Sequence, residues 1–157
     1  MFSLFIRNLI FTILQPGLVV GLVPYWLIRN KVDSLFVFPL KVHQYVGALI
    51  FILGWYLIFY CVYRFAIEGR GTLSPADPTK NLVVKGIYRY SRNPMYIGVT
   101  LALVGEVIFT LSSALLVYST IVFIAFNLFI ILVEEPRLRR DFGEEYLAYC
   151  RKVRRWV

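Results

Sequence analysis

Three long apolar runs alternate with polar segments along the chain. Residues 8–28 carry no charge over 21 positions, and residues 44–63 carry none over 20. Residues 93–133 carry a single charge, Glu106, over 41 positions. Because a helix needs about 20 residues to cross the roughly 30 Å apolar layer of a membrane, the first two runs predict one span each and the third predicts two. We therefore expect four transmembrane helices, at about 5–28, 43–66, 95–111 and 113–133.

The segments between these runs have their own patterns. Residues 67–94 form a polar loop whose first part is rich in turn-forming residues, with a short apolar patch, Leu82-Val83-Val84, that could return to the bundle. After the last run, apolar residues recur every three or four positions, which predicts an amphipathic helix over 134–153. Such a helix would lie along the membrane surface or cover a site in the loop. The stripe consists of Leu138, Phe142, Tyr146, Tyr149 and Val153.

Within the third run, Gly98, Ala102 and Gly105 follow one another at helical spacing. Small residues on one face of a membrane helix allow a neighbouring helix to approach closely. A close helix partner is therefore expected on this face. The fold class predicted is an all-α integral membrane protein with four transmembrane helices, a cytoplasmic loop and a C-terminal amphipathic helix, all in one domain.

Composition agrees with a membrane protein and adds an orientation. The apolar fraction is 59%, the mean hydropathy is +0.70 and the formal net charge is +8. With four spans, one side would hold 14 of the 17 basic residues, so both termini and the loop should face the cytoplasm. The charge then indicates topology and attraction to anionic headgroups rather than nucleic-acid binding. A signal peptide is the alternative for the first run, but its apolar core is too long.

Two groups of polar residues are candidates for chemistry. Glu106 lies near the middle of a predicted span, where a carboxylate is costly, so it could handle a proton or a cationic group; the alternative is a hydrogen bond across the bundle, for example to Asn127. Between Lys85 and Tyr96, arginines alternate with tyrosines, near the Glu134-Glu135 pair at the same membrane side. These side chains could bind an anion and stack on a base or cation. An ordinary interfacial belt of Tyr and Arg explains them equally well.

The order of these motifs resembles the integral membrane methyltransferases, the group that joins isoprenylcysteine carboxyl methyltransferase and the phospholipid N-methyltransferases. The resemblance rests on residues 82–98, the helical hairpin that follows, Glu134-Glu135 and residues 142–149. It implies binding of S-adenosylmethionine in a cytoplasmic pocket and methyl transfer to a lipophilic acceptor, a lipid amine or an isoprenylcysteine-like small molecule.

The resemblance also implies which residues hold the cofactor. They would be Gly69, Gly71, Lys80, Asn81, Leu82, Val83, Tyr88, Asn93, Pro94, Met95, Tyr96 and Glu134. Our hypothesis for the acceptor side is that Glu106 or Glu135 acts as the catalytic carboxylate and handles the proton or charge of the acceptor. No metal is implied, and Cys61 and Cys150 have no metal-binding spacing.

Two positions depart from the family pattern. Arg92-Asn93-Pro94 stands where the family usually has Arg-His-Pro, and residues 129–133 lack the arginine that precedes the glutamates in the isoprenylcysteine enzymes. Two other functions stay open from the sequence. One is a sterol-type membrane reductase that uses a nicotinamide cofactor, and the other is a non-catalytic membrane subunit.

Overall fold

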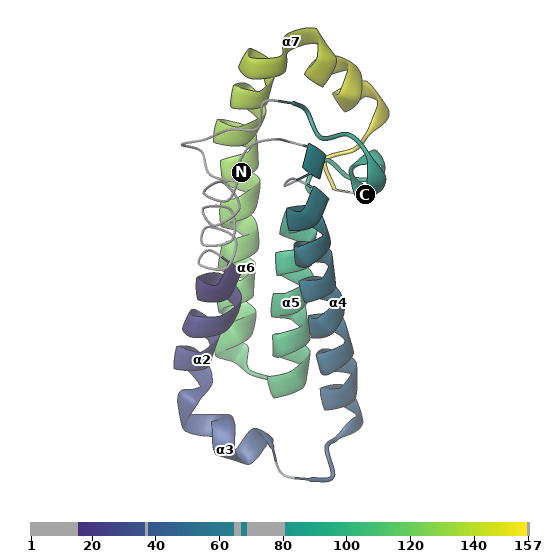
Figure 1. The fold of residues 1–157 in the computed structure, drawn as a ribbon. Coiled ribbons are helices and arrows are strands. Elements are labelled where there is room, and N and C mark those ends of the chain that lie inside the picture. Colours follow the sequence, from purple (N-terminus) through teal and green to yellow (C-terminus); the bar gives the residue numbers. More distant parts are fainter. Residues whose placement is uncertain (1–15, 37, 65–66, 69–80, 157) are drawn as a thin grey trace.

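A computed structural model of the protein describes residues 16–36, 38–64, 67–68 and 81–156. These residues form helices joined by short connections, and none of them lies in a strand. The helices Val42–Arg64, Pro94–Thr110 and Ser113–Phe129 run side by side along most of the molecule (Figure 1). In chain order the elements are η1 (Gly17–Leu22), α2 (Val23–Ile28), η2 (Arg29–Lys31), α3 (Val32–Leu35), α4 (Val42–Arg64), η4 (Gly86–Arg89), α5 (Pro94–Thr110), α6 (Ser113–Phe129), η5 (Ile130–Glu134) and α7 (Glu135–Lys152).

The contact between α4 and α5 is the most extensive one between helices, and glycine makes it possible. A Cβ atom added to Gly54 would lie 2.5 Å from the backbone nitrogen of Ala102, and one added to Gly105 would lie 2.5 Å from that of Phe51. The two backbones therefore approach closely where one of the helices has a glycine and so carries no side chain. This confirms the close helix partner that the small residues of the third run predict, and it identifies α4 as that partner.

Replacement of Gly54 by alanine should separate these helices, because the new methyl group would meet rigid backbone atoms rather than a movable side chain. We expect a loss of about 1–3 kcal/mol in the free energy of unfolding. Thermal unfolding in a mild detergent measures it. Gly21→Ala is the matched control, since a Cβ there meets nothing within 4 Å. Equal melting temperatures for the two variants would contradict this packing.

The helical hairpin of α5 and α6 turns where the sequence predicts it. Helix α5 ends at Thr110, and Leu111 adopts a left-handed conformation with φ of 49°. Ser112 then caps α6, because its hydroxyl accepts a hydrogen bond from the amide of Leu115 at 3.5 Å. The break expected between the predicted spans 95–111 and 113–133 is confirmed.

Two predicted segments differ from the structure. The connection expected over 29–42 begins with helical turns, η2 and α3, rather than a plain loop. The C-terminal helix, predicted over 134–153, also bends at Gly143, where φ is 50° and ψ is −124°. A glycine tolerates that backbone conformation. The bend lets the second half of α7 turn back toward the bundle, as the upper part of Figure 1 shows.

Two described helices are long and apolar enough to cross a membrane: α4, and the helix that begins at Ser113 and passes through η5 into α7. Helix α5 is also apolar but has 17 residues. Large apolar side chains are exposed on α4 and on the helix that begins at Ser113, among them Ile52, Phe59, Ile121 and Ile124. Such a surface suits contact with lipid rather than water. The count of four spans remains a prediction, and residues 5–15 of the first predicted span lie outside the described residues.

Candidate functional site

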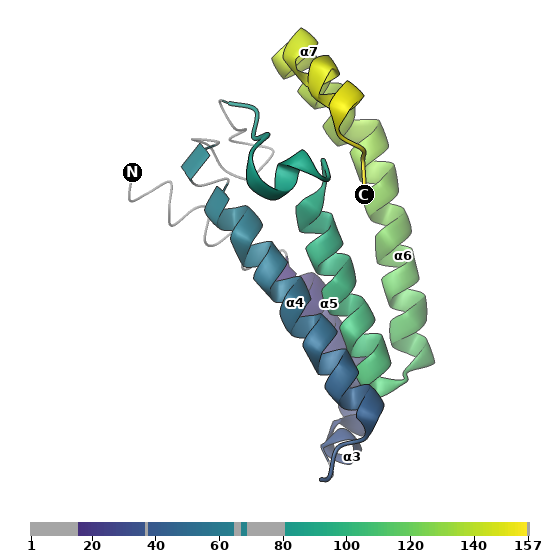
Figure 2. The ribbon, with the colours of Figure 1, turned by 90° about the vertical axis from the view of Figure 1, so that its right-hand side faces the viewer.

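The loop before α5, the start of α7 and the C-terminal segment meet at one end of the bundle (Figures 1 and 2), where their polar side chains contact one another. The loop reaches this place because its apolar patch is buried: Val83 packs with Tyr88 and with Cys61 of α4. The expectation that residues 82–84 return to the bundle is therefore confirmed. Tyr88 is 5% exposed, and burial, with the neighbouring Cys61 thiol as a further cause, raises its pKa well above the ordinary value.

A cavity of about 110 Å³ opens between the loop, α5 and α6. Its volume accommodates several water molecules or one part of a larger ligand. The wall combines polar groups near the loop with apolar groups further along the helices. The lining residues are Pro16, Val19, Tyr88, Arg92, Asn93, Pro94, Met95, Tyr96, Val99, Phe126 and Glu134.

Glu134 and Tyr96 form a hydrogen-bonded pair in this wall. The Tyr96 hydroxyl donates to Oε2 of Glu134 at 2.7 Å, and the Tyr96 ring packs edge-on against Phe126 with centroids 4.9 Å apart. Burial raises the pKa of Glu134, against the lowering effects of the Tyr96 hydroxyl and of Arg137. A cationic ligand in the cavity would offset that burial, since an opposite charge favours the carboxylate form.

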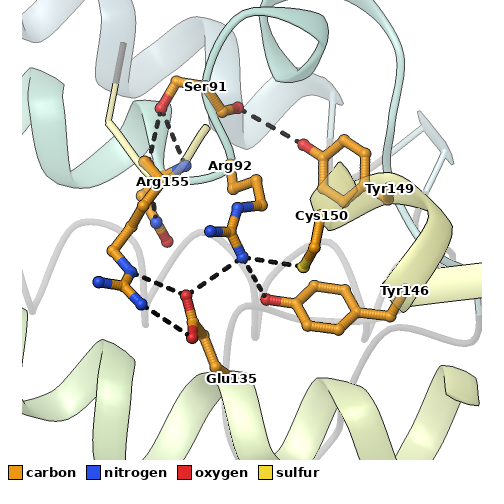
Figure 3. A network of polar contacts seen from close by, with 8 residues as sticks. Ser91, Arg92, Glu135, Tyr146, Tyr149, Cys150 and Arg155 are labelled. Carbon is orange, nitrogen blue, oxygen red and sulfur yellow. Dashed lines mark hydrogen bonds and ion pairs between the residues drawn. The ribbon is translucent and has the colours of Figure 1, made fainter. Parts of the chain in front are cut away.

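Arg92 contributes a guanidinium group to the cavity wall and is held from α7. Its Nη1 donates to Oε1 of Glu135 at 3.2 Å, to the Tyr146 hydroxyl at 3.3 Å and to the Cys150 sulfur at 2.9 Å (Figure 3). Its Nε is buried and has no hydrogen-bond partner among the described residues. A buried donor without a partner is costly unless a bound group or water satisfies it. Arg92 is thus able to bind an anionic group.

Glu135 is a structural neighbour of the cavity rather than part of its wall. Both oxygens accept from Arg155, with Nε at 2.8 Å and Nη2 at 3.1 Å, and Oε1 also faces Arg92. Burial would raise the pKa of Glu135, but the Arg155 hydrogen bonds and the charges of Arg92, Arg155 and Arg139 outweigh it, so the pKa lies below the ordinary 4.5.

This lowered pKa predicts a stability that depends on pH. Because folded Glu135 binds protons more weakly than unfolded Glu135, its stabilising contribution is complete above about pH 4.5 and is lost as the pH falls through the folded-state pKa. The difference in melting temperature between wild type and Glu135→Gln should therefore shrink below pH 4.5. Melting curves from pH 3 to 7 test this, with Glu145→Gln, exposed on α7, as the control. If the difference in melting temperature between wild type and Glu135→Gln stays constant from pH 3 to 7, ionised Glu135 does not stabilise the fold.

Of the residues that the resemblance implies for the cofactor, the structure brings six to the cavity: Tyr88, Asn93, Pro94, Met95, Tyr96 and Glu134. Asn81 and Leu82 are not in the wall, and Val83, also outside it, packs with Tyr88. Gly69, Gly71 and Lys80 lie outside the described residues.

Glu106, the other predicted catalytic carboxylate, does not line the cavity either. It lies ten residues beyond Tyr96, which is about 15 Å along a helix. The suggested bond to Asn127 is absent among the described residues, because that amide donates to the Phe123 carbonyl at 2.8 Å. Oε2 of Glu106 is buried with no partner among the same residues.

Sequence reasoning missed part of this wall. Arg92 lies inside the predicted motif, so its position beside Asn93 and Pro94 could have predicted its place in the wall. Val99 and Phe126 follow from helical spacing, since Val99 is one turn beyond Met95 and Phe126 is about two turns before Glu134. Pro16 and Val19 have no local signal, because only tertiary packing brings the first described helix to the cavity.

The fold and the cavity define a helical membrane protein with a polar site at the end of its bundle. Comparison with protein families adds the chemistry, since the model of the phospholipid methyltransferase family matches residues 42–145. The chain belongs to this family, and it is accordingly a membrane methyltransferase. No curated protein and no solved structure matches the chain significantly. The matched range covers α4, the loop, the hairpin and most of α7, so it includes most of the cavity wall.

Proposed function

We propose that the protein transfers the methyl group of S-adenosylmethionine to a lipid amine, and that the cavity beside Tyr96 and Glu134 binds the cofactor. The observation that carries this proposal is the presence of a half-buried carboxylate, Glu134, and a guanidinium group, Arg92, in one cavity wall. The amino-acid end of the cofactor has an ammonium and a carboxylate group, which need those two partners.

The donor set suits each part of the cofactor in turn. Glu134 would accept from the ammonium group, and the Arg92 guanidinium would donate to the carboxylate. The faces of Tyr88 and Tyr96 suit the sulfonium or the adenine, because an aromatic ring attracts a cation and stacks on a base. Asn93, Pro94 and Met95 would complete the wall. Gly69, Gly71, Lys80, Asn81, Leu82 and Val83 remain part of the proposal on the family pattern alone.

S-adenosylmethionine supplies a methyl group on a positively charged sulfur. The chain contributes position and exclusion of water, since methyl transfer is an in-line displacement that needs little acid or base chemistry from the protein. Val99 and Phe126 give the cavity an apolar wall further along α5 and α6. An acceptor with an apolar tail and a polar head suits a site that is apolar toward the helices and polar toward the loop.

The orientation proposed is that both termini and the cofactor site face the cytoplasm, where S-adenosylmethionine is made. The asymmetry of the basic residues supports it. The acceptor proposed is a lipid amine rather than an isoprenylcysteine carboxylate. Residues 129–133, one turn before the glutamates, contain no cation that could meet a substrate carboxylate.

Calorimetric titration with S-adenosylhomocysteine, the product form of the cofactor, tests the cofactor assignment on the full chain in nanodiscs. We expect saturable binding that NADPH does not displace. Displacement by NADPH would instead indicate a reductase site. Absence of binding to either nucleotide would contradict the proposal and favour a non-catalytic subunit.

Glu106→Gln tests the proposed separation between the cofactor site and the middle of α5. Glutamine has the size of glutamic acid and keeps hydrogen-bonding atoms, and the position lies about 15 Å along the helix from Tyr96. We therefore expect methyl transfer to fall less than about threefold. A loss of 100-fold or more in the turnover number, with unchanged S-adenosylhomocysteine affinity, would return Glu106 to a role in the reaction.

A further inference from the structure

The last described residues of the chain, 153–156, return from the end of α7 to the loop that enters α5, and we call them the C-terminal clasp. The backbone carbonyl of Arg154 accepts from the Arg92 amide at 3.0 Å. That of Arg155 accepts from the Ser91 hydroxyl at 3.2 Å and from the Asn93 side chain at 3.0 Å. Three consecutive loop residues, two of them in the cavity wall, are thus held by two carbonyls of the clasp.

The side chain of Arg155 makes a second connection to the same loop. It donates a bidentate hydrogen bond to Glu135, and Glu135 in turn accepts a hydrogen bond from Nη1 of Arg92 (Figure 3). The carboxylate is well shielded, since the side chain of Glu135 is 8% exposed and that of Arg92 is 13% exposed. A shielded carboxylate between two guanidinium groups fixes both in place more firmly than a surface pair would.

Apolar contacts fasten the clasp at both of its ends. Val153 is 8% exposed, and the ring of Trp156 packs against Phe123 of α6 with centroids 5.4 Å apart. The clasp therefore joins α6, α7 and the loop, and Arg155 lies between its two anchors.

We propose that Arg155 is a positioning residue for the cofactor, acting through Glu135 to hold Arg92 and through its own carbonyl to hold Asn93. The proposal rests on the proposed function of the cavity. Arg155 does not line the cavity, so its effect on a ligand passes through these two wall residues. Because Arg155 donates to both oxygens of Glu135, it fixes the carboxylate that accepts from Nη1 of Arg92, and with it the position of the Arg92 guanidinium in the cavity wall.

The first measurement needs no ligand. Hydrogen exchange at the Arg92 amide, in full-length protein in nanodiscs without cofactor, reports whether the clasp holds the loop. Arg155→Gln should speed this exchange about tenfold, because the loop then opens more often. Arg154→Gln is the matched control, since only the backbone carbonyl of Arg154 contacts the loop and its side chain is exposed. If the Arg92 amide exchanges at the same rate in Arg155→Gln as in wild type, the inference that the clasp holds the loop is overturned.

The second measurement is the affinity for S-adenosylhomocysteine by calorimetry. Arg155→Gln should weaken it about tenfold, whereas Arg154→Gln should leave it unchanged. Arg155→Lys should recover part of the lost affinity, because it keeps the positive charge but not the bidentate hydrogen bond. A melting temperature within a few degrees of wild type separates positioning from unfolding.

The outcomes distinguish the two proposals. If wild type binds S-adenosylhomocysteine and Arg155→Gln binds it equally well, the positioning role is overturned while the cofactor site stands. If wild type binds none, the cofactor site and the role of Arg155 toward it are both overturned. The exchange measurement then still decides whether the clasp holds the loop.

Discussion

Glu134→Gln is expected to weaken S-adenosylhomocysteine binding by about 10- to 100-fold, because it removes the only carboxylate in the cavity wall formed by the described residues. Glutamine keeps an oxygen that can accept from the Tyr96 hydroxyl, so the wall itself should stay in place. The loss would then measure the charge that meets the ammonium group. Calorimetry on both proteins gives the ratio of dissociation constants.

Two controls sharpen this result. Glu144→Gln removes a carboxylate from the exposed face of α7 and should leave the affinity unchanged. Tyr96→Phe removes the hydroxyl that donates to Glu134 and keeps the ring, so it should cost less than Glu134→Gln. Equal affinities for wild type and Glu134→Gln would place the ammonium group elsewhere and contradict the assignment of this cavity.

Glu135→Ala is expected to have the largest effect on stability, a loss of about 3–4 kcal/mol in the free energy of unfolding. The substitution leaves two guanidinium groups, from Arg92 and Arg155, without their shared carboxylate in a shielded place. Removal of one partner from such a pair costs more than the pair itself contributes, because the remaining charge is desolvated and unpaired. Chemical denaturation in detergent measures it.

A double-mutant cycle separates the pair from the rest of the fold. Glu135→Ala and Arg155→Ala together should cost less than the sum of the single changes, because the second removes a charge that the first left unpaired. Glu145→Ala, on the exposed face of α7, should change stability by less than about 0.5 kcal/mol. Purely additive losses would show that Glu135 and Arg155 do not act as one unit.

The sequence predicts the parts of this fold that depend on local pattern. The apolar runs give α4, α5 and α6 to within a few residues at each end, and Ser112 marks the turn between the last two. The small residues of α5 predict a close partner, because backbone contact requires the absence of side chains. The burial of Val83 follows from an apolar patch in a polar loop.

What the sequence could not predict depends on contacts between distant segments. Nothing in the local pattern of Arg155 distinguishes it from Arg154, because both are arginines in a basic tail, yet one side chain is bound to Glu135 and the other is exposed. The bend at Gly143 brings this part of the tail to the loop, where the two arginines have different surroundings. A straight helix would carry the tail onward, whereas the bent one returns it to the loop, and a glycine in a helical pattern does not by itself reveal which way the chain turns.

The two glutamates after α6 also have different surroundings, although they are neighbours in sequence. On a helix, adjacent residues point about 100° apart. Glu134 consequently faces Tyr96 and the cavity, while Glu135 faces the arginines of the loop and the clasp.

The most direct test of the central claim follows a labelled methyl group. The full-length protein in nanodiscs, given S-adenosylmethionine with a labelled methyl group and a total lipid extract, should produce labelled amine lipid that partitions into organic solvent. At cofactor concentrations below saturation, Glu134→Gln should slow this reaction by about 10- to 100-fold, whereas Glu144→Gln should not. A wild-type protein that binds S-adenosylhomocysteine yet labels no lipid would contradict the claim that this site methylates a lipid amine.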